Sequence, residues 1–266
     1  MPIPSNPLPL KKIAEVTLLF WVMKICATTL GETAGDLLAQ TMKIGYGASS
    51  LILVGIFLLV LGAQLAVSRY IPWLYWAVIL ATSTAGTTMS DYMDRTLGLG
   101  YATGALILVS ILAVVLGLWR LSEKSLSVNA ITTRRGELFY WTAILFSNTL
   151  GTALGDYLAD DSGLGFGGGA LLIGSLLAVV VLAYYFTSLS RVLLFWVAFV
   201  LTRPFGATFG DLLTKEPDKH GLGFGTRGSS LILFALLLGL IIYTSLRPKT
   251  PEPALAIDEA AEKVGR

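Results

Sequence analysis

Four aspartates recur in the same local sequence, and they are the residues with the clearest potential for chemistry. Each has a glycine five residues before it and a tryptophan fifteen residues before it; the four are Asp36, Asp91, Asp156 and Asp211. Ionisable groups in apolar helices are costly and tend to mark ion or substrate routes. We therefore interpret the four acids as parts of one acidic centre, and not as separate caps or packing residues, which is the alternative reading for any single copy.

The helical phase of each acid predicts the side chains that accompany it. At about 100° per residue, positions 4, 7 and 11 residues before the aspartate share its face of the helix. On that face we expect five supporting hydroxyls and one further acid: Thr29, Thr84, Thr87, Thr149, Thr152 and Glu32. The fourth copy carries Ala207 and Pro204 on that face and so has fewer side-chain oxygen atoms. The four helices together would line a vestibule open to the outside.

Oxygen ligands of this kind suit a hard cation such as Mg²⁺, Ca²⁺ or Mn²⁺, and the lack of Cys and His on the face disfavours zinc or copper. The predicted metal-binding residues are Glu32, Asp36, Asp91, Asp156 and Asp211. The single histidine, His220, falls in a loop and is expected to be a solvated surface residue.

The composition indicates that these acids sit in a membrane protein. The chain is 55% hydrophobic and 14% charged, with a mean hydropathy of +0.74, so too few polar side chains exist to cover a water-facing surface. Eight apolar segments, each near the ~20 residues that span a bilayer, lie at 13–33, 47–67, 71–90, 102–121, 138–158, 168–188, 192–212 and 229–246. The predicted fold class is all-α: a polytopic membrane protein of eight transmembrane helices, arranged as four tandem hairpins with pseudo-fourfold or two-plus-two symmetry.

The spacing of the acids divides the chain. Successive aspartates are 55, 65 and 55 residues apart, which indicates an older duplication of a pair of repeats. We expect an N-terminal tail at 1–10, a first membrane half at 11–121, a linker at 122–135, a second half at 136–246 and a C-terminal tail at 247–266. A glycine turn follows each acid at Gly45, Gly100, Gly165 and Gly223, and the fourth is three residues further on than the others.

Basic residues set the expected orientation. Twelve Lys and Arg fall at the termini or in loops after even-numbered segments, and five fall on the other side. The positive-inside rule therefore places both termini in the cytoplasm and all four aspartates toward the outer face. No cleavage site follows the first apolar run, so we expect it to be retained as a helix. The one cysteine, Cys26, has no partner for an internal disulfide.

The shared offsets of Trp, Gly and Asp, exemplified by Trp21, Gly31 and Asp36, carry a family resemblance. They resemble bacterial membrane proteins assembled from four tandem two-helix repeats, known as a repeat of unknown function. The resemblance covers about residues 11–246. It implies this architecture and an inner (plasma) membrane location, and it implies no settled activity.

Two cations lie deep within the predicted helices: Lys24, twelve residues before Asp36, and Arg203, eight before Asp211. Neither can easily reach an interface, so we expect an internal carboxylate partner or a water-filled cavity. One hypothesis is that Lys24 or Arg203 neutralises the acidic cluster when no substrate ion is bound. The alternative is a purely structural ion pair.

These observations favour a transporter of a cation, with manganese as the preferred example. The run from Glu32 to Asp36 resembles the Glu-x-Gly-Asp motif of a manganese and calcium transporter family, with one additional residue and in one repeat only. The main alternative is a non-transporting membrane sensor or scaffold. Expected partners are membrane lipid and a small cation, with no nucleic acid; the oligomeric state stays open.

Two further classes are disfavoured. Gly45-Tyr46-Gly47 is similar to a potassium-channel filter, but about ten residues after an aspartate are too few for a pore helix as well. An intramembrane aspartyl protease needs a Gly-x-Gly-Asp motif and a pair of acids, whereas here only the second glycine is present. We find no P-loop, catalytic triad or cofactor fingerprint and expect neither enzymatic activity nor a cofactor.

Overall fold

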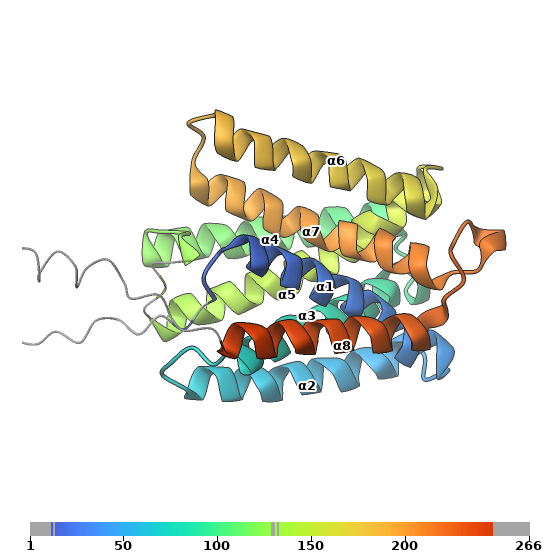
Figure 1. The fold of residues 1–266 in the computed structure, drawn as a ribbon, viewed down its shortest axis with the longest axis horizontal. Helices are drawn as coiled ribbons and strands as arrows, with labels where there is room; N and C mark the ends of the chain where they lie inside the picture. Colours follow the sequence, from blue (N-terminus) through green and yellow to red (C-terminus); the bar gives the residue numbers. More distant parts are fainter. Residues whose placement is uncertain (1–11, 13, 129–130, 132, 247–266) are drawn as a thin grey trace, which may run out of the picture.

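The structure is a computed structural model that describes residues 12, 14–128, 131 and 133–246. The described residues form eight α-helices and no strand: α1 (Leu18–Asp36), α2 (Tyr46–Ala66), α3 (Pro72–Asp91), α4 (Tyr101–Glu123), α5 (Arg134–Asp156), α6 (Gly165–Phe186), α7 (Arg191–Thr214) and α8 (Gly225–Leu246) (Figure 1). All-α architecture is thus confirmed for this part of the chain, and each helix begins and ends within five residues of its expected position. The expected tails at 1–10 and 247–266 lie outside the described residues.

Local sequence explains where the odd-numbered helices start. The hydroxyls of Thr17, Thr133 and Ser190 accept hydrogen bonds from backbone N–H groups in the first turns of α1, α5 and α7. The helix α3 begins with Pro72, whose fixed φ suits a first helical position. These caps satisfy backbone donors that a bilayer could not satisfy.

The helices form an inner ring and an outer layer. In the ring, α1 packs on α3, α3 on α5, α5 on α7, and α7 on α1. Each outer helix packs on the first helix of the next repeat: α2 on α3, α4 on α5, α6 on α7 and α8 on α1. The long axes of the helices run along one common direction in Figure 1. The last repeat therefore closes on the first.

The glycines five residues before the aspartates set the spacing of the ring. A Cβ added at Gly31, Gly86, Gly151 or Gly206 would lie closer than 3.0 Å to an atom of the next inner helix. The opposing residues are Ser83, Asn148 with Thr149, Arg203 and Thr28. Each junction thus pairs the glycine five residues before one aspartate with the residue eight before the aspartate of the next inner helix. Any larger residue would force the inner helices apart, which explains why glycine recurs there.

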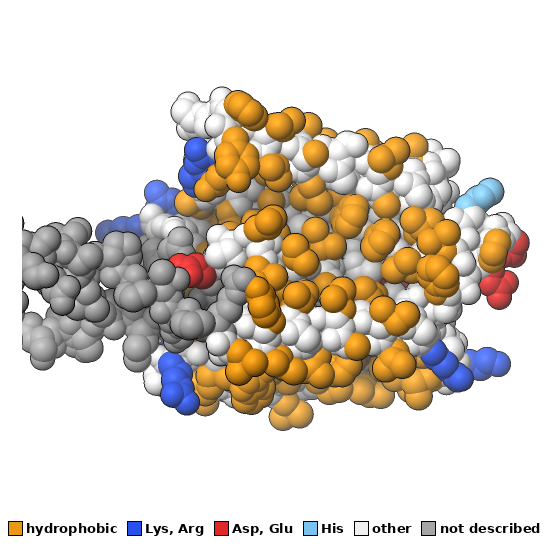
Figure 2. All heavy atoms as spheres, viewed as in Figure 1, with side chains coloured by type: hydrophobic (Ala, Val, Ile, Leu, Met, Phe, Trp, Pro, Cys, Tyr) orange, Lys and Arg blue, Asp and Glu red, His pale blue; other side chains and the backbone are white. Residues whose placement is uncertain are grey.

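Apolar surface is concentrated on the outer layer. Within the described residues five helices are long and apolar enough to cross a membrane: α2, α4, α6, α7 and α8. Hydrophobic side chains cover the face seen in Figure 2 between its two ends. The inner helices α1, α3 and α5 carry many buried Thr and Ser residues, and because other helices surround them they need no lipid-facing stripe. These features are compatible with a multi-pass membrane protein.

An aromatic layer lies at the end of the ring away from the aspartates. Its rings pack between neighbouring inner helices with centroids 5.4 to 5.7 Å apart, in the pairs Phe20 with Trp76, Tyr75 with Trp141, and Trp21 with Phe195. The hydroxyls of Tyr75 and Tyr140 are 2.6 Å apart and share a hydrogen bond. The recurrent tryptophans thus hold the ring together at this end.

The connection after α7 differs from the expected one. Positive φ angles occur in glycine pairs, at Gly163 and Gly165 before α6 and at Gly223 and Gly225 before α8. Gly225, and not Gly223, therefore corresponds to Gly165. Gly165 follows its aspartate by nine residues and Gly225 follows its own by fourteen, a difference of five and not three. Because α7 continues to Thr214, the connection itself, 215–224, is only one or two residues longer than the other three. The expectation was wrong because spacing alone cannot say which glycine of a pair starts the helix.

Candidate acidic ion site

The four aspartates lie at the C-terminal ends of the inner helices and are buried. Asp36, Asp91 and Asp156 end α1, α3 and α5, Asp211 lies in the last turn of α7, and each is 2–3% exposed. Each of the first three is followed directly by a π-helical turn, at Leu37–Thr41, Tyr92–Thr96 and Tyr157–Asp161. A buried carboxylate is costly unless a charge partner compensates it. The arrangement therefore needs cations close by.

Arg95 is the cation that joins Asp91 to Asp156. It lies in the turn η2 (Tyr92–Thr96), with its Nε 2.9 Å from Asp91 Oδ1 and its Nη2 3.2 Å from Asp156 Oδ2. Burial lowers the pKa of Arg95, but the carboxylates of Asp156 and Asp91 outweigh it and raise this pKa above its ordinary value. We call Asp91, Asp156 and Arg95 the arginine half of the site.

Lys215 joins the other two aspartates. Its Nζ lies 2.7 Å from Asp36 Oδ2 and 3.1 Å from Asp211 Oδ1. Burial lowers the pKa of Lys215, and the carboxylates of Asp211 and Asp36 again outweigh it and raise this pKa overall. We call Asp36, Asp211 and Lys215 the lysine half.

Sequence reasoning missed both of these cations. It counted Arg95 and Lys215 only as loop residues on the outer side. A local signal was present: each follows an aspartate by four residues, one helical turn, whereas Gln40 and Asp160 occupy that position in the other two repeats. The cation therefore alternates around the ring, in a two-plus-two pattern.

Beneath the aspartates, Glu32 and Arg203 form a fully buried ion pair. Arg203 Nη1 lies 3.0 Å from Glu32 Oε2, and Arg203 Nη2 donates hydrogen bonds to Thr87 and, at 2.7 Å, to Thr152. Thr87 also donates to Glu32 Oε2 at 3.2 Å. Arg203 thus has the internal carboxylate partner that its depth in the helix indicated.

Lys24 lies deeper and away from the acids. It is 0% exposed, donates a hydrogen bond to Asn148 Oδ1 at 3.3 Å and lies 4.1 Å from the ring centroid of Phe199. Within the described part of the chain no carboxylate lies within ion-pair distance of it. The structure therefore brings Arg203, but not Lys24, to the acidic cluster.

Three of the expected hydroxyls turn to their own helices. Thr29, Thr84 and Thr149 donate to the carbonyls of Ile25, Leu80 and Leu145, four residues before them. The residues that contact the glycine of the preceding inner helix are instead eight before the aspartate, such as Arg203 and Asn148. Positions 4 and 8 residues before the aspartates, and not 7, meet inside the ring, where Arg203 contacts Glu32, Thr87 and Thr152.

The expected open vestibule is closed in this structure. The side chains of Arg95 and Lys215 are 33% and 19% exposed, whereas the carboxylates they contact in Asp36, Asp91 and Asp156 are 2–3% exposed. The acids thus have almost no direct contact with solvent, and a partly exposed cation lies beside each pair of them.

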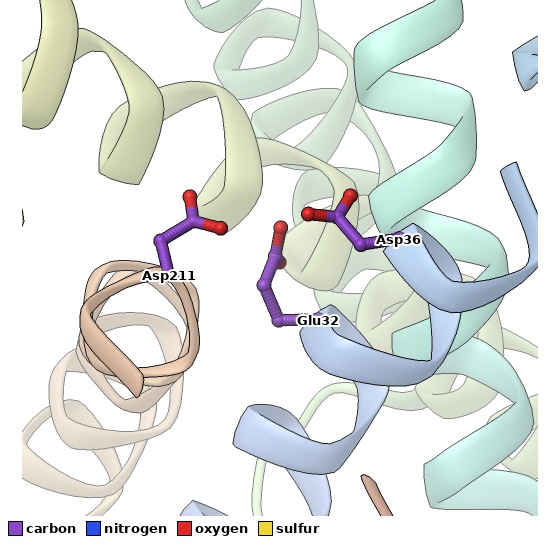
Figure 3. Close-up of side chains that lie close together, drawn as sticks. All are labelled: Glu32, Asp36 and Asp211. Atoms are coloured by element: carbon purple, nitrogen blue, oxygen red, sulfur yellow. The ribbon is translucent and has the colours of Figure 1, made fainter. Parts of the chain in front are cut away.

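One group of carboxylates has the spacing of a metal site. Ligand oxygens of Glu32, Asp36 and Asp211 all lie within 4.8 Å of one another, and all three residues are buried. Figure 3 shows the three carboxylates pointing toward one another from α1 and α7. Asp91 and Asp156 are not in this group. Among the described residues, only this group, which joins Glu32 to the two aspartates of the lysine half, brings together three carboxylates of the kind that bind a hard divalent cation.

Comparison with known proteins places the chain in a family. The family model described as Repeat of Unknown Function (DUF347) matches residues 19–70, 74–125, 139–190 and 194–250. The chain belongs to this family. The resemblance indicated by its Trp, Gly and Asp offsets is therefore confirmed. Searches of curated proteins and of solved structures return no match.

Each DUF347 repeat holds one aspartate near the end of its first helix and one outer helix. The site is therefore built between repeats. Arg95 of the second repeat reaches Asp156 of the third, and Lys215 of the fourth reaches Asp36 of the first. The lysine half exists only because the ring closes.

Proposed function

We propose that this protein is an eight-span transporter of a divalent cation in the bacterial inner membrane, with manganese as the preferred example. The observation that carries the proposal is the group of three buried carboxylates, Glu32, Asp36 and Asp211, whose oxygens lie within 4.8 Å of one another at one end of an apolar helical bundle. The proposal includes no enzymatic activity and no cofactor.

The chemistry of the group supports an ion as its substrate. Buried carboxylates in membrane proteins are costly and are retained where they bind or relay ions. Asp211 Oδ1 is buried and lies 3.1 Å from the Lys215 ammonium, so this oxygen already faces a cation and can serve as a ligand. Oxygen donors without Cys or His favour Mn²⁺, Ca²⁺ or Mg²⁺ over softer metals.

The proposed membrane arrangement has its own support. The inner helices α1, α3 and α5 have 19, 20 and 23 residues, and even α1 is about 28 Å long, close to the ~30 Å of a hydrocarbon core. The repeated glycine junctions favour pseudo-fourfold packing, and the alternation of Arg95 and Lys215 favours two-plus-two symmetry at the site. Basic residues favour cytoplasmic termini and an outward-facing acidic end.

A non-transporting sensor or scaffold is the second candidate, and one observation favours it. Each aspartate already has an internal cation within 3.2 Å, so the site is compensated without any ligand. A purely structural network of this kind would hold the repeats together. Ion flux distinguishes the two candidates.

The test is uptake into proteoliposomes that contain the purified full chain, with Mn²⁺, Ca²⁺, Mg²⁺ and K⁺ supplied in turn. We expect saturable uptake of a divalent ion that Asp36→Asn and Asp211→Asn each abolish. Asp161→Asn, which changes an exposed acid just outside the site, is the matched control and should retain uptake. Uptake of no ion, or uptake that both site variants retain, would contradict the transporter and leave the sensor or scaffold.

A further inference from the structure

We propose that Lys215 is a tethered competitor of the substrate: its ammonium group occupies the divalent-ion position between Asp36 and Asp211 and must withdraw before the ion binds. The inference rests on the proposed transport function and adds the device that makes the site selective for divalent ions and able to release them.

The ammonium group of Lys215 lies at the position proposed for the divalent ion. Lys215 Nζ is the one cation among the described residues that touches both carboxylates, at 2.7 Å from Asp36 and 3.1 Å from Asp211. Asp211 Oδ1 has this contact but accepts no hydrogen bond from the described residues. This oxygen belongs to the same carboxylate that faces Glu32 and Asp36 in Figure 3. A cation is therefore already bound where the substrate would bind.

The side chain of Lys215 can move while its backbone stays in place, because the backbone N–H donates to Asp211 O at 2.8 Å and the carbonyl accepts from Gly223 N–H at 2.9 Å. Lys215 directly follows the last residue of α7, with extended backbone angles (φ −70°, ψ 153°), and begins the longest of the four connections after an inner helix. Its side chain is 19% exposed, while those of Asp36 and Asp211 are 3% and 4% exposed. Rotation of its flexible stem can thus carry the ammonium into water while the inner helices keep their packing.

Charge explains why a divalent ion would replace it. Arg203 neutralises Glu32, so the charge of the lysine half depends on Asp36, Asp211 and Lys215. With Lys215 in place, two carboxylates and one ammonium sum to −1. With Lys215 withdrawn, the two carboxylates sum to −2, which one divalent ion neutralises. A monovalent ion would only restore −1, so it gains nothing over the tethered ammonium. The return of Lys215 would in turn displace the bound divalent ion.

Amine labelling of the intact protein tests the withdrawal directly. The purified full chain is reductively methylated with and without Mn²⁺, and labelling is followed at Lys215 and at the exposed Lys219 by mass spectrometry. We expect Mn²⁺ to raise the labelling rate of Lys215 several-fold, in a saturable manner, and to leave Lys219 unchanged. An unchanged or slower rate at Lys215 would overturn the inference.

Substitution of the lysine tests the competition. Lys215→Gln keeps the length of the polar side chain but removes its charge, so we expect the Kd for Mn²⁺ to fall by about tenfold if the lysine fills the site nine-tenths of the time. Lys215→Arg, which retains a tethered cation, should keep a Kd close to that of the unmodified protein. Lys219→Gln is the surface control and should do the same.

The outcomes separate the two proposals. If the unmodified protein binds Mn²⁺ and Lys215→Gln binds it no more tightly, the competitor role fails and the transport proposal stands. If neither protein binds Mn²⁺, both proposals fail. Labelling of the unmodified protein covers the case in which the Gln variant does not fold.

Discussion

The arginine half and the lysine half of the acidic layer are built from the same parts and differ in how firmly their cation is held. Each has two aspartates from neighbouring repeats and one cation, which follows one of these aspartates by four residues, about one helical turn. Arg95 uses separate nitrogens for its two aspartates, lies 3.9 Å from Asp160 and lies 5.5 Å from the ring of Tyr101. Lys215 uses a single nitrogen for both carboxylates.

The difference follows from side-chain chemistry. A guanidinium group is planar and binds two carboxylates at once through different N–H groups, whereas an ammonium group is a point charge on a flexible stem. The lysine half also has Glu32 beside it, while the equivalent position four residues before Asp156 is Thr152. One repeat motif thus serves as a fixed clamp in one half and offers an exchangeable cation position in the other.

The largest expected effect comes from the ion pair beneath both halves. Arg203→Met leaves Glu32 buried without its charge partner, and loss of one member of a buried pair costs about 3–5 kcal/mol. We expect a large drop in Tm and in yield of folded protein. The double variant Arg203→Met with Glu32→Gln should recover most of this loss. Equal instability of the single and double variants would show that Arg203 stabilises the ring by packing alone.

The two clamping cations should respond differently to Mn²⁺. Arg95→Gln and Lys215→Gln each leave two buried aspartates without their cation, and we expect either change to lower Tm. Mn²⁺ at about 100 times its Kd stabilises a protein that binds it by about 2.7 kcal/mol. Arg95→Gln keeps the proposed ion site and its competing lysine, whereas Lys215→Gln lacks the competitor, and a tenfold lower Kd is worth about 1.4 kcal/mol. At one Mn²⁺ concentration Tm should therefore rise further in Lys215→Gln than in Arg95→Gln, as measured by thermal unfolding in detergent. An equal rise in both variants would remove the distinction between the halves.

A smaller effect is expected at Asp94, beside the arginine half. Burial raises the pKa of this carboxyl, and its Oδ1 has no hydrogen-bond partner among the described residues. Because the folded-state pKa is raised, the ionised form costs stability at neutral pH, and the cost is lost progressively as pH falls from the raised folded value to the unfolded value of about 3.9. Asp94→Asn should thus increase stability at pH 7 by about 1 kcal/mol. Thr214 occupies the same position in the lysine half, so Thr214→Ala should lack this pH dependence.

The smallest effect concerns alkaline pH. The pKa of Lys215 is raised in the folded state, so its contribution to stability is fully present below the unfolded lysine pKa of about 10.4 and is lost only as pH rises through the higher folded value. The difference in Tm between the unmodified protein and Lys215→Gln should then stay constant from about pH 6 to 9. A difference that shrinks steadily over this interval would contradict a charged Lys215.

The architecture could be predicted from the sequence because the same residue pattern occurs in each of the four repeats. Hydropathy located the eight helices, and the recurrence of Gly31, Gly86, Gly151 and Gly206 marked the ring contacts that the structure places at every inner junction. The depth of Arg203 and Lys24 in apolar helices predicted a carboxylate partner or a water-filled cavity for each, and Arg203 has such a partner in Glu32 whereas Lys24 contacts Asn148 and Phe199. These features depend on local composition and on repetition, both of which are visible in one chain.

Features that depend on how the repeats close could not be read so directly. Lys215 and Asp36 are 179 residues apart and meet only because α7 packs on α1. The choice between threonines seven residues before the aspartates and side chains eight before them depends on the crossing of neighbouring helices, as for Thr29 and Arg203. The roles of Arg95 and Lys215 could have been predicted from the sequence, because each follows an aspartate by four residues and so forms an acid–base pair one helical turn apart.

The central claim is that a single divalent-ion site lies in the lysine half, and Mn²⁺ titration of three proteins tests it most directly. The unmodified chain, Asp211→Asn and Asp91→Asn are titrated by calorimetry in detergent after each has been checked for cooperative unfolding. We predict one ion per chain in the unmodified protein, no binding in Asp211→Asn, and retained binding in Asp91→Asn. Loss of binding in both variants alike, or no binding in the unmodified chain, would contradict the account.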